Sequence, residues 1–144
     1  MGFEMDPREL TEEEADVLRD VTAWWKANRD WMTGADILRL DSADPAVMAE
    51  QHLEEGGRQF VVFAGKAATS DQFAPRPLRL TRLSPEAKYR VELINRADVG
   101  HLSRGANALK SGPFVVSGAY LMYHGLTLPW SFPERMWVIK GDLA

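Results

Sequence analysis

The spacing of the hydrophobic residues changes at Gly34, and this change most limits the folds open to the chain. Before Gly34, Leu18, Val21 and Trp25 recur every three or four residues, as on one face of an α-helix. After Gly34, short segments alternate with a period of two, which is typical of β-strands. We therefore expect a mainly β fold preceded by one N-terminal α-helix.

The helix has a clear start signal. Thr11 is followed three residues later by Glu14, the capping-box pattern in which each side chain accepts a hydrogen bond from the other residue's backbone N–H. Lys26 and Arg29 lie near the expected end, where positive charge stabilises the helix dipole. These signals predict one helix over about residues 12–32, ended by the glycine that follows.

Short segments after the helix are expected to be strands. Two glycines in Glu54-Glu55-Gly56-Gly57 suit a tight turn, so residues 47–53 and 58–64 are predicted to form a β-hairpin. Phe60–Phe63 is apolar on both faces, as in a central strand. The other expected strands are 36–40, 78–81, 89–93, 114–117, 120–123 and 136–140.

No long helix interrupts these segments, which is typical of an antiparallel β-sandwich of the Greek-key type. Residues 65–77 and 95–113 have no hydrophobic periodicity and are predicted to be loops. We therefore divide the chain into a helical segment, residues 1–34, and an antiparallel β-sandwich, residues 35–144.

Composition excludes several classes of function. The 144 residues include no cysteine, so disulfides, thiolate metal sites and cysteine nucleophiles are excluded. A formal net charge of −4 offers no basic field for nucleic acid. No apolar run approaches the ~20 residues that span a membrane. The acid-rich start is the opposite of a secretory signal, so we expect a cytoplasmic protein.

The common catalytic and cofactor motifs do not occur. The sequence has no Gly-x-Ser-x-Gly, no phosphate-binding or dinucleotide glycine pattern, and no His-Glu-x-x-His, so we expect no cofactor. The three histidines are far apart in sequence and are expected to be structural or on the surface: His52, His101 and His124. Three clustered aspartates are expected to form turns or caps, not a metal site: Asp36, Asp41 and Asp44.

Tryptophan is a better guide to function, because indole faces stack on sugar rings as well as packing in cores. Trp24, Trp25 and Trp31 lie on the expected helix and Trp137 on an expected strand, so these four are predicted to pack internally or at an interface. Trp130 lies in a loop between a proline and a serine, and it is the candidate substrate-binding residue.

Three segments carry a resemblance to a known family. Gly2-Phe3-Glu4-Met5-Asp6-Pro7 and the helix after it look like the last strand and helix of the catalytic barrel in bacterial α-galactosidases of glycoside hydrolase family 36, the melibiase type. Leu83–Val91 is similar to that family's Leu-Asp-Pro-x-Ala-x-Tyr-x-Val, with Ser84 in place of Asp. Ser117–Leu126 is similar to its Ser-Gly-x-x-Leu-Met-x-x-Gly-Leu.

The resemblance implies that residues 1–34 end a (β/α)₈ barrel and that residues 35–144 form the C-terminal sandwich of an enzyme that hydrolyses terminal α-galactosides such as melibiose or raffinose with retention. The family's catalytic aspartates lie on earlier barrel strands, so we expect no catalytic residue in this chain and no activity from it alone. Glu4 and Asp6 are the positions expected nearest a bound sugar, without a catalytic role.

The expected partner is the catalytic barrel of the parent enzyme, or a second copy bound through the helix around Trp24 and Trp25. Adjacent helical residues point about 100° apart, so these two indoles give an apolar face wide enough for two neighbours. A free-standing carbohydrate-binding β-sandwich with Trp130 as its stacking surface is the alternative. A protein-interaction sandwich would also fit the composition, but it leaves the barrel-like first residues unexplained.

Overall fold

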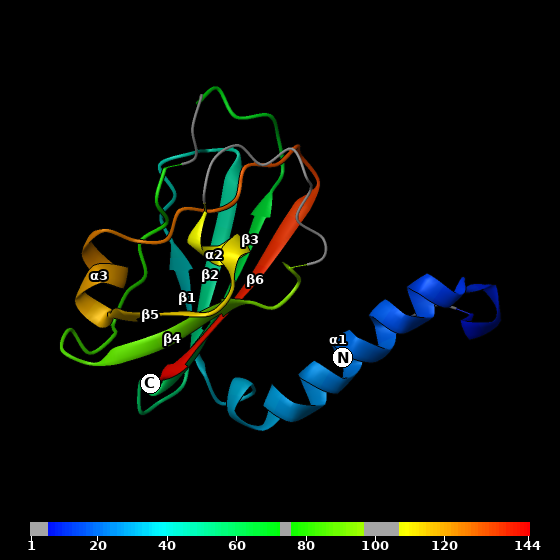
Figure 1. The fold of residues 1–144 in the computed structure, drawn as a ribbon, viewed down its shortest axis with the longest axis horizontal. Helices are drawn as coiled ribbons and strands as arrows, with labels where there is room; N and C mark the ends of the chain where they lie inside the picture. The colour runs from blue at the N-terminus through cyan, green and yellow to red at the C-terminus, as the bar shows by residue number, and fades with distance from the viewer. Residues whose placement is uncertain (1–5, 73–75, 97–106) are drawn as a thin grey trace. The chain divides into compact units, whose positions relative to one another are not determined.

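The computed structural model describes residues 6–72, 76–96 and 107–144 of the chain. The chain divides into two compact units, Met1–Gly34 and Ala35–Ala144, at the glycine where the hydrophobic periodicity changes (Figure 1). Within the described residues, no helix has both the length and the apolar character needed to cross a membrane.

The first unit consists of a 3₁₀ turn, η1 (Pro7–Glu9), and the predicted helix, α1 (Glu12–Met32). The capping box is confirmed: Glu14 N donates to the Thr11 hydroxyl at 3.3 Å, and Thr11 N donates to the Glu14 carboxylate at 2.9 Å. The Thr11 backbone N–H, with the Thr11 hydroxyl, lowers the pKa of Glu14. The start of α1 is therefore fixed by local hydrogen bonds.

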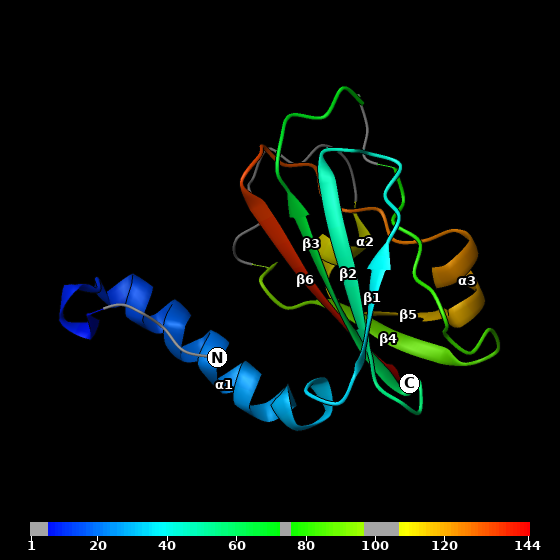
Figure 2. The same cartoon turned by 180° about the vertical axis from the view of Figure 1, so that it is seen from behind.

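The second unit contains one sheet with the strand order β1-β2-β3-β6-β4-β5, in which every described pair of neighbouring strands is antiparallel. The strands are β1 (Asp36–Leu40), β2 (Val47–Leu53), β3 (Gln59–Lys66), β4 (Lys88–Leu93), β5 (Phe114–Ser117) and β6 (Arg135–Leu143). The sheet is strongly twisted, so β4 and β5 cross the direction of β2 and β3 (Figures 1 and 2). The predicted mainly β, antiparallel fold with one preceding helix is confirmed.

The strand β3 lies in the centre of the sheet, as its apolar sequence predicts. Phe60, Val61 and Val62 have no exposed surface. The hairpin with β2 is confirmed, with Leu53 opposite Phe60, and Gly57 in its turn has φ 66°, which suits glycine. The strand β6 then inserts between β3 and β4, and so joins the strands β1–β3 to β4 and β5 in one sheet.

Two of the expected strands take other forms. Residues 120–123 belong to a short helix, α3 (Gly118–Tyr123), because the Ser117 hydroxyl caps it by accepting from Tyr120 N at 3.1 Å. Residues 78–81 form a single bridge, Leu78 to Leu126, rather than a strand. The apolar run at residues 120–123 fits a strand or a helix equally well, so the sequence pattern did not decide between them.

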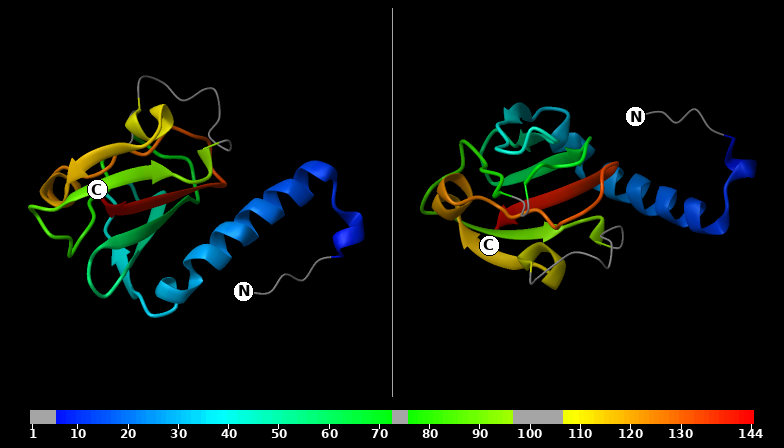
Figure 3. Two further views of the ribbon diagram at one scale, coloured as in Figure 1. Left: turned by 60° about the horizontal axis from the view of Figure 1, so that its bottom comes forward. Right: turned by 90° about the horizontal axis from the view of Figure 1, so that it is seen from above.

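The core lies between one face of the sheet and the segments that cover it, which include residues 76–83, α2 (Ala108–Ser111) and α3 (Figure 3). A buried amide fixes this layer to the sheet. Gln51 has no exposed surface, its Nε2 donates to Thr81 O at 2.9 Å, and its Oε1 accepts from Thr81 N at 3.0 Å. Both ends of the amide are satisfied, as a buried polar group requires.

The Phe60 ring on β3 packs over Gly141 on β6, so position 141 has no room for a side chain. In Gly141→Ala the new methyl carbon would lie 2.2 Å from the Phe60 ring. We predict that this change lowers the free energy of unfolding by about 1–3 kcal/mol, measured by urea denaturation.

Gly65→Ala on β3 is the matched control, because nothing lies within 4 Å of its added carbon. Its stability is expected to change by less than about 1 kcal/mol. An equal loss in the two variants would show that the contact with Phe60 is not the cause.

Candidate functional site

The sequence candidate Trp130 is half-buried and is held by its neighbours. Its ring meets Phe132 edge to face, with centroids 4.9 Å apart, and Lys66 Nζ lies 5.8 Å from the ring centroid. The same ammonium group donates to Ser131 O at 2.8 Å, and Lys66 is 8% exposed. A buried lysine on β3 therefore anchors the loop that carries the indole.

The space beside Trp130 is small. The cavity is about 20 Å³, and its polar lining includes Asp44, Lys66 and Gln72. A volume of this size holds about one water molecule, whereas ligand pockets measure ~300 Å³ or more. The arrangement favours packing of the indole against its own loop.

The described histidines lie apart, as expected. His52 on β2 contacts Glu50 at 2.9 Å, while His124 follows α3 and stacks on Tyr120. His101 lies outside the described residues. In residues 6–72, 76–96 and 107–144, no three His, Asp or Glu side chains gather as metal ligands would.

The expected turn role fits the structure at Asp44, which accepts from Ala46 N at 2.9 Å. It does not fit at Asp36, which lies on β1 and forms an ion pair with Arg82 at 2.8 Å. Asp41 lies at an open cleft described below.

Asp6, placed near a sugar by the resemblance, caps η1 by accepting from Arg8 N at 2.9 Å. The Arg8 guanidinium also contacts the carboxylate at 2.6 Å and lowers the pKa of Asp6. A lowered pKa keeps the carboxylate charged, which suits a cap and not a general acid. Glu4 lies outside the described residues.

The two resemblance segments in the second unit contact each other. Gly118 N donates to Ala87 O at 2.8 Å, and Ala119 N donates to Pro85 O at 3.0 Å. A carbon added to Gly118 would lie 2.0 Å from Ser84 O. These motif residues therefore make a close backbone contact between α3 and the turn before β4.

The second of these segments ends in another close contact. Gly125 has φ 89°, and a carbon added there would lie 2.6 Å from Leu78 O. Leu78 and Leu126 exchange two backbone hydrogen bonds of 2.8 Å. A glycine is required here by both conformation and space.

Residues 44–144 match the family model described as "Glycosyl hydrolase family 36 C-terminal domain". The chain belongs to this family. The resemblance of Leu83–Val91 and Ser117–Leu126 is thereby confirmed, and the close contacts of Gly118 and Gly125 lie within the matched residues.

Known proteins that resemble this family 36 chain are much longer. An alpha-galactosidase of Escherichia coli is 26% identical over 150 residues, an alignment covering 100% of this chain and 21% of that protein. The galactosidase domain of alpha-galactosidase-sucrose kinase AgaSK matches with TM-score 0.78 and 21% identity over 99% of this chain and 18% of that one. A variant of AgaA from Geobacillus stearothermophilus in complex with raffinose matches with TM-score 0.68 and 21% identity over 94% and 17%. The chain thus spans about one fifth of these relatives.

The structure also brings together residues that the sequence reasoning missed. Arg39, Arg76 and Arg79 line one open cleft of about 810 Å³ on the family 36 domain. Arg39 and Arg79 each stand between two leucines, so an arginine within an alternating apolar segment was the available signal. Nothing in the sequence pattern showed that these segments would meet.

We predict that galactose and raffinose bind beside Trp130 no more tightly than millimolar, because the space there admits no sugar ring. Amide chemical shifts followed during sugar titration test this. A Trp130→Phe variant shows whether any shift change depends on the indole ring or arises from added sugar in general. Saturable shifts around Trp130 at micromolar sugar, lost in Trp130→Phe, would support the carbohydrate-binding alternative.

Proposed function

We propose that this chain serves as the C-terminal β domain of an α-galactosidase and has no catalytic activity alone. The match of residues 44–144 to the family 36 C-terminal domain carries the proposal. The relatives named as α-galactosidases are about five times as long, and their remaining sequence offers room for a catalytic domain.

The absence of a suitable carboxylate pair supports a noncatalytic role. A retaining glycosidase needs two carboxyl groups about 5–5.5 Å apart on either side of the bond that breaks. In the described part of the second unit, the cavity beside Trp130 is lined by one carboxylate, Asp44, and the cleft with the three arginines by one, Asp41. Neither space offers the required pair.

The parent enzyme would hydrolyse terminal α-galactosides of the melibiose and raffinose type with retention. The raffinose complex of the Geobacillus stearothermophilus relative supports this substrate class. In a retaining reaction one carboxylate attacks the sugar and a second protonates the leaving oxygen, so both groups would come from the parent's other residues.

The helix α1 is the proposed contact with a partner. Val17 and Val21 are 54% and 46% exposed, and both lie on the stripe that continues through Trp24. Exposed apolar side chains on one helix face mark an interface. We propose that the parent's catalytic barrel covers this stripe, and that a second copy covers it when the barrel is absent.

The first test is activity. The isolated chain is expected to release no nitrophenol from an aryl α-galactoside, because neither space considered in the described second unit offers a carboxylate pair. Replacing the C-terminal fifth of the Escherichia coli relative with this chain is expected to give a soluble, active chimera.

A chimera carrying Gly118→Ala is the matched control and is expected to lose soluble enzyme, since the added carbon would lie 2.0 Å from Ser84 O. Turnover by the isolated chain that survives repurification and is inhibited by galactose would overturn the noncatalytic role.

The second test concerns association through α1. We predict that the sedimentation coefficient of the isolated chain rises with concentration and that Val21→Lys abolishes this rise. Ala23→Lys is the control, because it adds the same charge about 200° around the helix. Equal effects of the two variants would argue against the stripe as the contact.

A further inference from the structure

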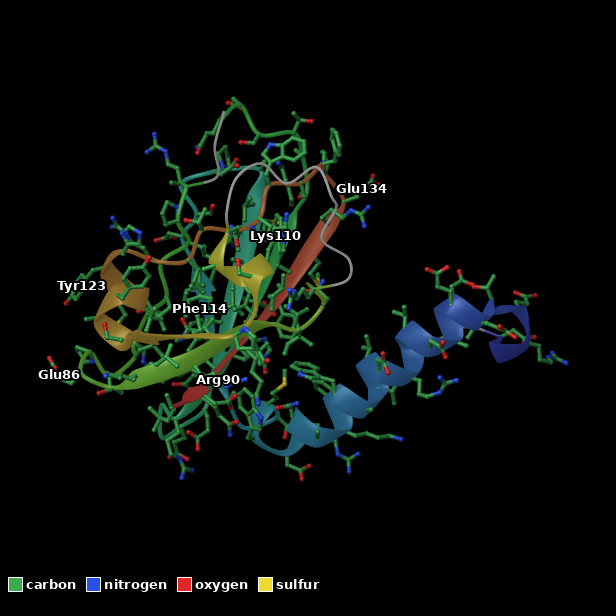
Figure 4. The ribbon with its side chains drawn as sticks, viewed as in Figure 1. Glu86, Arg90, Lys110, Phe114, Tyr123 and Glu134 are labelled. Atoms are coloured by element: carbon green, nitrogen blue, oxygen red, sulfur yellow. The ribbon has the colours of Figure 1, made fainter. Side chains whose placement is uncertain are left out.

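The cleft with the three arginines is formed by three segments of the second unit. These are the end of β1 and the residues after it, the segment 76–81, and the end of α3. The side chains that concern its chemistry are Arg39, Arg76, Arg79, Asp41, Tyr123 and His124. Tyr123 projects from α3 in Figure 4 and is 73% exposed.

The cleft has an excess of positive charge in a chain whose formal net charge is −4. Three arginines line it with a single acidic residue, Asp41. Elsewhere in the described residues, five arginines have an acidic partner: Arg8, Arg19, Arg29, Arg58 and Arg82. None of the described ion pairs includes an arginine of the cleft.

The backbone that presents Arg79 is held in place on both sides. Leu78 and Leu126 exchange hydrogen bonds of 2.8 Å, and Leu80 N donates to Leu121 O at 3.0 Å. Leu78 and Leu80 are 2% and 3% exposed, so Arg79 between them is turned outward. A fixed backbone lowers the ordering cost of binding a ligand.

We propose that this cleft binds a small anionic ligand that carries two or more phosphate or carboxylate groups. A guanidinium group donates two parallel hydrogen bonds to either group, and three such groups within one cleft match several negative charges. The volume of about 810 Å³ lies within the ~300–1,000 Å³ of ordinary ligand sites. The hydroxyl of Tyr123 and the ring of His124 offer further polar contacts.

Pyrophosphate is the first probe, titrated into the whole chain at low salt and followed by amide and arginine side-chain chemical shifts. We expect saturable shifts in the residues of the cleft. Arg79→Gln is expected to weaken binding about tenfold, the loss expected for one charged hydrogen-bond donor. Citrate in a second titration distinguishes a carboxylate ligand from a phosphate ligand.

Arg90→Gln is the matched control. Arg90 is also exposed and outside the described ion pairs, and it lies on β4, away from Tyr123 (Figure 4). It is expected to leave the affinity unchanged. An equal loss in Arg90→Gln, shifts that never saturate, or binding of polyglutamate but neither small anion would each overturn the proposal.

Discussion

The hydroxyl of Tyr89 joins the turn before its own strand, β4, to the β2–β3 turn, which lies 32 residues earlier in the chain. It accepts from Ser84 N at 3.3 Å and donates to Gly57 O at 2.9 Å, and the residue has no exposed surface. Its ring also packs against Phe60, with centroids 5.7 Å apart. The turn before β4, the β2–β3 turn and the centre of the sheet therefore meet at one side chain. A buried hydroxyl with both partners present is stabilising, and it is costly to leave unsatisfied.

The covering layer depends on this arrangement. With the turn before β4 fixed, its carbonyls receive the first N–H groups of α3, and Gly118 lets the two backbones approach. The end of α3 then leads into the bridge between Leu78 and Leu126. The residues that carry the family resemblance thus allow close packing of the backbone. The backbone beside Arg79 in the arginine cleft is held by the same bridge.

Elements that depend on contacts between residues close in sequence could be predicted from the sequence. Thr11 and Glu14 fix the start of α1 by contacts within one turn of helix, and two glycines suffice to predict the β2–β3 hairpin. Residues 120–123 were predicted to be a strand but form part of α3. An apolar run of four residues shows no periodicity, and the Ser117 side chain caps the helix that forms there. Trp130 was predicted as a candidate site residue because it lies in a loop. The contact that holds this loop could not be predicted in the same way, because it comes from Lys66, 64 residues earlier.

By itself the sequence determined the helix, the central strand, the hairpin and the family, because each rests on neighbouring residues or on a linear motif. Only the tertiary structure decided that β6 inserts between β3 and β4, because strand pairing depends on contacts between distant residues. It also decided which charges meet. Arg39 and Arg79 are 40 positions apart, and they line one cleft because Arg39 lies on β1 of the sheet and Gln51 of the neighbouring strand β2 holds the segment of Arg79 against that sheet.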